Sequence, residues 1–125
     1  MISLILLIGL GGAIGAIARF GLHTALQSQV DDFPLGTLAV NVLGCFLLGA
    51  VLAFSELRPN LSANTRAFIT VGVLGSFTTF STFGAETFEL IRTKETHLAL
   101  LSVGGNLFVG LLAVLAGRAL IKAAM

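Results

Sequence analysis

Four apolar stretches, each about as long as a membrane-spanning helix, constrain the fold more than any other feature of this chain. They cover about 2–18, 36–54, 67–91 and 98–117. A helix needs about 20 apolar residues to cross the hydrocarbon core of a bilayer. Charged residues make up only 10% of the chain, against roughly a quarter in soluble domains. The sequence therefore predicts an all-α membrane protein with four transmembrane helices, at about 2–26, 35–55, 65–91 and 97–121.

The connections between these stretches are short and polar: "QSQVDDFP", "SELRPNLSANTR" and "RTKETH". They leave no room for a soluble domain, so we expect residues 1–125 to form a single transmembrane domain. The first stretch could also be a signal peptide, but such peptides normally begin with positive side chains. No Lys or Arg precedes Arg19. We therefore expect the first stretch to remain as a helix.

Positive residues are divided almost evenly between the two faces of the expected bundle. One face, with both termini and the second connection, carries Arg58, Arg66, Arg118 and Lys122; the other carries Arg19, Arg92 and Lys94. An excess of Lys and Arg orients a membrane protein with that face toward the cytoplasm, so this chain has little preference. Insertion in both orientations would allow an antiparallel, dual-topology homodimer. The alternative is that the weak bias only reflects the small number of charges.

Two asparagines lie inside apolar stretches, where an unpaired polar group is costly. Asn41, in "TLAVNVLG", offers two donors and an acceptor. It either bonds a neighbouring helix or contacts a ligand in a pore. Asn106, in "SVGGNLFVG", follows Ser102 by one helical turn. Residues one turn apart share a helix face, so these two could line a polar track.

The third stretch is the least regular of the four. Its glycines and hydroxyl residues include Gly72, Gly75, Ser76, Thr78, Thr79, Ser81 and Thr82. Glycine adds backbone freedom and hydroxyls compete for backbone hydrogen bonds, so both weaken a helix. We expect the third helix to be broken near its middle, close to Gly75. In lipid, a break is tolerated only where the freed groups face protein, water or an ion, and freed carbonyls suit a hard monovalent cation such as sodium.

Phenylalanines recur at positions 77, 80 and 83, and Glu86 continues the spacing. Such a stripe most often serves packing or faces lipid. Aromatic rings have a positive edge, however, so rings presented edge-on can attract an anion without a full charge that would trap it. The hydroxyls of Ser81 and Thr82 can donate hydrogen bonds beside them. Glu86 has three possible interpretations: it lies at the wet end of the helix, it accepts from those hydroxyls, or it is protonated.

Three motifs in this chain resemble those of the small fluoride channels of the Fluc, or CrcB, family. They are "GAIGAIAR" at 12–19, "GTLAVNVLG" at 36–44 and the highly specific "GVLGSFTTFSTF" at 72–83. The resemblance covers essentially the whole chain. It implies a dual-topology homodimer with two antiparallel pores in the bacterial plasma (inner) membrane. Such a channel exports fluoride passively and protects the cell from HF, which enters freely and dissociates inside.

The same resemblance implies roles for individual pore residues. Phe80 and Phe83 would present their ring edges to fluoride, and Asn41 would be the pore amide. Ser81, Thr82 and Glu86 would form a polar track beside them, and Ser102 and Asn106 would extend this track along the fourth helix. These last two fall where some relatives carry tyrosine and serine.

Two further sites are implied by the resemblance. A structural sodium ion, which is not transported, would bind the backbone carbonyls of Gly75 and Thr78 from both subunits. Arg19 resembles the family's helix-one arginine near an aqueous vestibule. The implied partners are fluoride, a second copy of the chain and the lipid bilayer.

Other classes of protein fit less well. A proton-coupled small multidrug exporter of dual topology also has four helices, but it would need a carboxylate in the first helix and Trp or Tyr for aromatic cations. The first stretch has no Asp or Glu, and the chain has no Trp or Tyr. "GLGGAIG" is similar to a dinucleotide-binding loop, but Ile14 replaces the third glycine and no strand precedes it. We therefore expect no enzyme, and a net charge of +1 offers no footprint for nucleic acid.

Overall fold

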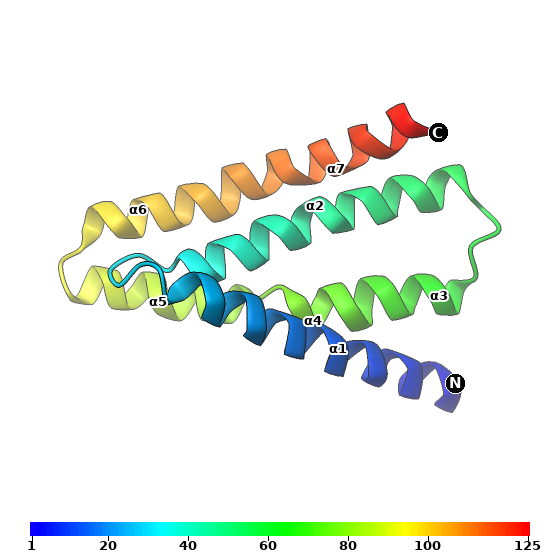
Figure 1. Ribbon diagram of the computed structural model, residues 1–125, viewed down its shortest axis with the longest axis horizontal. Helices are drawn as coiled ribbons and strands as arrows, with labels where there is room; N and C mark the ends of the chain where they lie inside the picture. The colour runs from blue at the N-terminus through cyan, green and yellow to red at the C-terminus, as the bar shows by residue number, and fades with distance from the viewer.

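The computed structural model describes residues 1–125, and all of its regular secondary structure is helical (Figure 1). The chain runs up and down four times through α1 (Ile2–Gln27), α2 (Leu35–Leu57), α3 (Ala63–Ala67), η1 (Phe68–Leu74), α4 (Gly75–Phe77), α5 (Phe80–Arg92), α6 (Thr96–Gly104), η2 (Gly105–Val109) and α7 (Gly110–Ala124). Segments α3 to α5 form the third pass, and α6 to α7 form the fourth. Each of the four passes is long and apolar enough to cross a membrane. The ranges predicted from the sequence differ from these bounds by no more than three residues.

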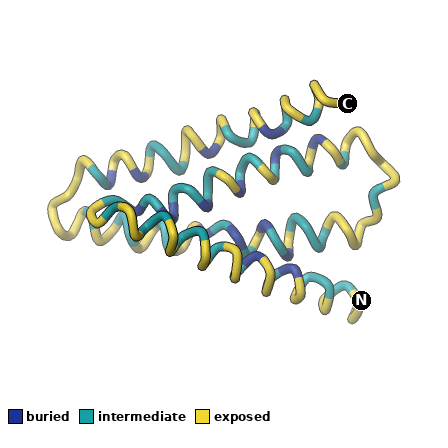
Figure 2. The backbone as a smooth tube through the Cα atoms, viewed as in Figure 1, coloured by how far each residue is buried: buried dark blue, intermediate teal, exposed yellow.

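Few residues of the bundle are buried (Figure 2), and many of the exposed side chains are large and apolar. Leu6, Ile17, Phe20 and Leu112 are among the large apolar side chains that stay exposed. Water would strongly disfavour so much contiguous apolar surface. Lipid tails solvate such a surface well, so the exposure agrees with four membrane-spanning passes.

Glycines bring neighbouring passes into close contact. Helix α2 packs along α7, and α1 packs against η1 and α4 (Figure 1). A Cβ on Gly49 would overlap the Val114 carbonyl, and a Cβ on Gly117 would overlap the Phe46 carbonyl. Small residues allow this approach of backbones in lipid, where packing contacts drive helix association.

The third pass is interrupted at Thr78 and Thr79, which have extended backbone angles of φ −84°, ψ 160° and φ −151°, ψ 116°. The sequence predicts a break near Gly75, but Gly75 itself is helical, with φ −62° and ψ −34°. The interruption falls later because the Thr79 hydroxyl caps α5 by accepting the Thr82 N–H. Glycine has no side chain with which to begin the next helix in this way.

Two segments are π-helical, η1 in the third pass and η2 in the fourth. These wider turns insert into otherwise α-helical passes and are frequent at functional sites. Segment η2 includes Asn106, and η1 leads through α4 to the interruption. The irregular backbone of both passes therefore borders the same part of the bundle.

Candidate functional site

A groove of about 510 Å³ opens beside the interruption. Its walls come from α2, from η1 and α4, from the start of α5, and from the fourth pass. The polar side chains that line it are those of Asn41, Thr70, Thr78, Thr79 and Asn106. No charged side chain lines the groove. A ligand in it would therefore meet neutral donors and acceptors among apolar and aromatic walls.

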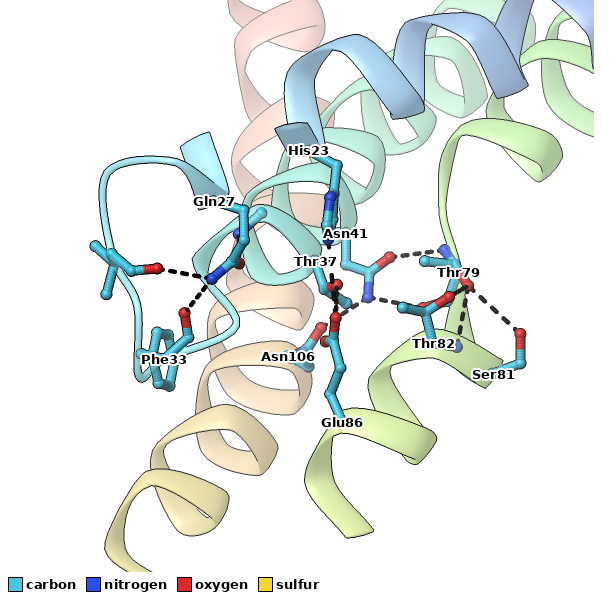
Figure 3. Close-up of polar contacts among 12 residues, drawn as sticks. His23, Gln27, Phe33, Thr37, Asn41, Thr79, Ser81, Thr82, Glu86 and Asn106 are labelled. Carbon is cyan, nitrogen blue, oxygen red and sulfur yellow. Dashed lines mark hydrogen bonds and ion pairs between the residues drawn. The ribbon is translucent and has the colours of Figure 1, made fainter. Parts of the chain in front are cut away.

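Asn41 joins α2 to the interrupted backbone (Figure 3). Its Oδ1 accepts the Thr79 N–H at 2.8 Å, and its Nδ2 donates to the Thr79 carbonyl at 3.0 Å. In an unbroken helix, the Thr79 N–H would instead bond the Gly75 carbonyl. The side-chain amide of Asn41 thus replaces the missing helical hydrogen bonds. Of the two alternatives raised by the sequence, the structure shows the bond to a neighbouring pass. Asn41 also lines the groove, and its contact with a ligand stays a prediction.

The orientation of the Asn41 amide determines which donors remain free. The Thr79 N–H can only donate, so it must face Oδ1 of Asn41. Nδ2 then donates its second hydrogen to Asn106 Oδ1 at 2.8 Å. Asn106 Nδ2 donates one hydrogen to the Ser102 carbonyl at 2.9 Å, which leaves its second hydrogen available. In this arrangement the free amide donor at the groove belongs to Asn106.

Three hydroxyls cluster where α5 begins (Figure 3). Thr79 Oγ1 donates to Thr82 Oγ1 at 3.0 Å and lies 3.5 Å from Ser81 Oγ. Thr79 lines the groove, whereas Ser81 and Thr82 lie next to it in the first turn of α5. The sequence predicts for Thr79 only a part in weakening the third helix, although Thr79 is the residue that connects Asn41 to these hydroxyls. The adjacent threonines of "TTF" are the signal that could have identified it.

Phe80 and Phe83 meet edge to face on α5. Their ring centroids are 5.5 Å apart and the ring planes lie at 67°. Both rings line the groove, and Phe80 is 82% exposed. Phe77 lies in α4, before the interruption, and is only 6% exposed. The spacing of three residues therefore does not form one continuous stripe, because the extended residues rotate Phe77 away from the other two.

Glu86 lies further along α5, where it accepts a hydrogen bond from Thr37 Oγ1 at 2.9 Å (Figure 3). Its Oε1 is also 3.8 Å from His23 Nε2. Of the three interpretations of Glu86, acceptance from Ser81 or Thr82 is wrong, because the donor is Thr37 on α2. Thr37 is almost fully buried, at 1% exposure. It precedes Asn41 by one helical turn, and that shared face could have indicated its part in the site.

Two backbone carbonyls at the interruption are released from helical hydrogen bonds. The N–H groups that would bond Gly75 and Thr78 belong to Thr79 and Thr82, and these donate to Asn41 Oδ1 and Thr79 Oγ1 instead. Gly75 and Thr78 both line the groove. Arg19 Nη1 donates to the Thr78 carbonyl at 3.4 Å. The structure has no cluster of three or more His, Cys, Asp or Glu side chains that could hold a metal ion. The neutral oxygens at the interruption are the released carbonyls of Gly75 and Thr78 together with the hydroxyl and amide oxygens that line the groove.

Sequence comparisons identify the family. Residues 6–118 match the family described as "CrcB-like protein, Camphor Resistance (CrcB)". The chain belongs to the CrcB family. Among its relatives, a protein of Parabacteroides distasonis named "Fluoride-specific ion channel FluC" is 48% identical over 94% of this chain and 91% of its own length. "Fluoride-specific ion channel FluC 3" of Methanosarcina barkeri is 41% identical over 91% and 86%, and "Fluoride-specific ion channel FluC" of Thermus thermophilus is 47% identical over 90% and 88%.

In this member of the CrcB family, the two polar residues of the fourth pass differ in their surroundings. Asn106 lines the groove and bonds Asn41. Ser102 is 1% exposed, does not line the groove, and its Oγ has no hydrogen-bond partner. They share a helix face as the sequence predicts, but only Asn106 reaches the groove within a single chain.

Proposed function

We propose that this protein is a fluoride-selective passive channel that lets fluoride leave the cytoplasm and so relieves fluoride toxicity. One observation carries the proposal: the groove combines an edge-to-face phenylalanine pair with neutral amide and hydroxyl donors and has no charged wall. The family membership and the names of its relatives support the same function. In this proposal, the bilayer is the plasma (inner) membrane of a bacterium.

The chemistry of the groove suits a small, strongly hydrated anion. A pore must replace the lost hydration of its ion without binding it too tightly to release it. The free Asn106 donor, the hydroxyls at the start of α5 and the ring edges of Phe80 and Phe83 are all uncharged. The first N–H groups of α5 add a partial positive charge at the same end of the helix. Weak contacts in series would admit fluoride and let it leave.

A second copy of the chain would complete the path. The groove is open on one side and exposes Phe80 to the surroundings. An antiparallel partner placed over it would supply the missing wall, and its own groove would form a second pore. Residues Ser81, Thr82, Glu86 and Ser102 would then extend each path as a polar track. Arg19 would lie in the aqueous vestibule at one end.

A structural sodium ion fits the residues around the interruption. The carbonyls of Gly75 and Thr78 are hard, neutral oxygen ligands released from helical bonds, which is the ligand type that coupling ions find at unwound helices. Two carbonyls from each copy would meet at the centre of the homodimer. The Arg19 guanidinium on the Thr78 carbonyl would have to yield to the ion.

Liposomes loaded with potassium fluoride test the channel function. Purified protein is reconstituted, valinomycin is added to let potassium leave, and fluoride release is followed with an electrode. Chloride-loaded vesicles run alongside. We expect rapid fluoride release, no chloride release and no requirement for a proton gradient. Release that depends on a proton gradient would instead favour the small multidrug-type exporter, and no release from folded, dimeric protein would remove the channel function.

A further inference from the structure

His23 on α1 and Glu86 on α5 face each other at the end of the bundle where the first and third connections lie (Figure 3). His23 Nε2 is 3.8 Å from Glu86 Oε1, which also accepts from Thr37. The second carboxylate oxygen, Oε2, and His23 Nε2 are both buried, and neither has a hydrogen-bond partner. A proton on Nε2 would give the imidazole a donor and a positive charge directly beside this carboxylate.

The histidine ring is held in this position by the start of α2. A Cβ on Gly36 would come within 2.8 Å of His23 Cδ2 and 2.6 Å of the His23 carbonyl oxygen, so the ring and backbone rest directly on the glycine. Gln27 in turn accepts the Gly36 N–H at 3.1 Å and donates to the carbonyls of Val30 and Phe33. The ring therefore cannot turn into α2 and remains directed at α5.

We infer that His23 controls the charge at one end of the proposed fluoride path by pairing with Glu86, and thereby makes fluoride flux depend on pH. The inference rests on the proposed channel function. Glu86 continues the helix that carries Phe80 and Phe83, and its carboxylate repels an approaching anion. Histidine changes charge between pH 5 and 8. A protonated His23 neutralises Glu86, so flux rises as the pH falls.

Two of the other charged groups near this pair already have partners, and two more carboxylates share a hollow with Glu86. Arg19, one turn before His23 on α1, donates to the Thr78 carbonyl. Glu89, one turn after Glu86, pairs with Arg92. From the first connection, Asp31 and Asp32 share with Glu86 and Glu89 a hollow of about 230 Å³. Neither η1 nor α4 has a charged residue, and the only one in α2, Glu56, lies at the opposite end. His23 is therefore the histidine that lies beside the Glu86 carboxylate.

A second histidine provides a matched control. His97 Nδ1 lies 3.7 Å from Glu95 Oε2, at the same end of the bundle, but both side chains are largely exposed and lie away from the groove. H97Q removes a histidine that meets the same pH as His23. It tests whether any histidine near a glutamate at this end has the same effect.

The experiment measures fluoride release from liposomes at equal pH inside and outside, from pH 5.5 to 8. Protein-free vesicles at each pH correct for HF that leaks through lipid. We expect flux through the unmodified protein and H97Q to rise several-fold on acidification. H23Q should stay at the low level at every pH. H23K, which keeps a positive charge throughout, should stay high and flat.

Failure of this inference differs from failure of the channel function. No fluoride flux at any pH in the unmodified protein would overturn the function itself. Flux that does not change with pH in the unmodified protein, or an unchanged pH profile in H23Q, would overturn only the role of His23. If H23Q does not form a dimer, E86Q tests the same inference. E86Q removes the carboxylate that a protonated His23 would neutralise, so its fluoride flux must no longer rise on acidification.

Discussion

The side chain of Asn41 makes three hydrogen bonds to two other passes. It holds both the N–H and the carbonyl of Thr79, a residue that is only 8% exposed. Buried backbone groups without partners are costly, and the interruption creates such groups in the middle of an apolar pass. The amide of Asn41 satisfies them and, through Asn106, connects the second, third and fourth passes.

Replacing Asn41 with alanine should destabilise the protein. N41A leaves the Thr79 N–H and carbonyl without partners, which costs about 1–3 kcal/mol for each buried group. The measurement is unfolding in a detergent and SDS titration followed by circular dichroism. N64A is the control, because Asn64 is exposed on α3 and makes no side-chain hydrogen bond. Equal stability of N41A and the unmodified protein would show that Thr79 is satisfied in another way.

Phe80 and Phe83 should matter for flux rather than for folding. F80I and F83I keep an apolar side chain but remove the polarised ring edge, so each should lower fluoride release at least about tenfold if the edge contributes about 1.4 kcal/mol to the barrier. F88I is the control, since Phe88 is exposed on the same helix but does not line the groove. Gel filtration should show that these variants form dimers to the same extent as the unmodified protein. Undiminished flux in both groove variants would remove these rings from the path.

Residue types predicted the site better than residue partners did. Asn41, Phe80, Phe83 and Asn106 were selected from the sequence, and all four line the groove. Their roles in fluoride conduction stay predictions. The partner of Asn41 could not be predicted, because Thr79 is 38 positions away and only the packing of α2 on the third pass brings them together.

At the scale of elements, the four helical passes can be predicted from composition, but the positions at which a pass is interrupted cannot. Four apolar stretches between short polar connections are enough to predict four passes. The interruption depends on which residue caps the next helix, and Thr79 has a hydroxyl where Gly75 has none. The π-helical segments η1 and η2 begin without any side-chain cap, so no capping residue could have indicated them in the sequence.

The contact between α2 and α7 should depend on a glycine. G49A places a Cβ against the Val114 backbone, which cannot move as a side-chain tip can. Overpacking of this kind costs about 1–3 kcal/mol. G9A is the matched control, because nothing lies within 4 Å of a Cβ at Gly9, and alanine there improves helix propensity by up to about 1 kcal/mol. Thermal unfolding in detergent should rank G9A at or above the unmodified protein and G49A below it; the reverse order would mean that the passes are less closely packed.

The whole molecule lacks a charge signal that would orient it. Three positive residues lie at the end with the first and third connections and four at the other. Both orientations would then be present in one membrane, and the exposed groove would find a partner of opposite direction. Composition could predict this balance, but the shape of the surface that would join two copies depends on the interruption and could not be predicted.

Two sets of substitutions should separate the orientations. The first combines R58Q and R66Q with S28K, which leaves two positive residues against four. The second combines R92Q and K94Q, which leaves one against four in the opposite sense. A variant that carries either set alone should insert in one direction and conduct no fluoride. The two variants produced together in the same membrane should restore fluoride flux. Reporter fusions at the C-terminus measure the direction. Full flux from either set alone, with a single direction established, would contradict the antiparallel dimer.

Sodium dependence tests whether the two interruptions meet at the centre of such a dimer. The two released carbonyls of Gly75 and Thr78 in one copy are by themselves too few oxygens to replace the hydration of a cation, whereas two copies double that number. An ion held in this way stabilises only the assembled form. Protein purified with choline as the sole cation should therefore lose dimer stability and flux, and sodium chloride should restore both where potassium chloride does not. Because no substitution removes a backbone carbonyl, this exchange of cations tests the site directly. Unchanged dimer stability and flux without sodium would mean that the released carbonyls accept from another donor instead. Arg19, which donates to the Thr78 carbonyl, is the nearest candidate for that donor.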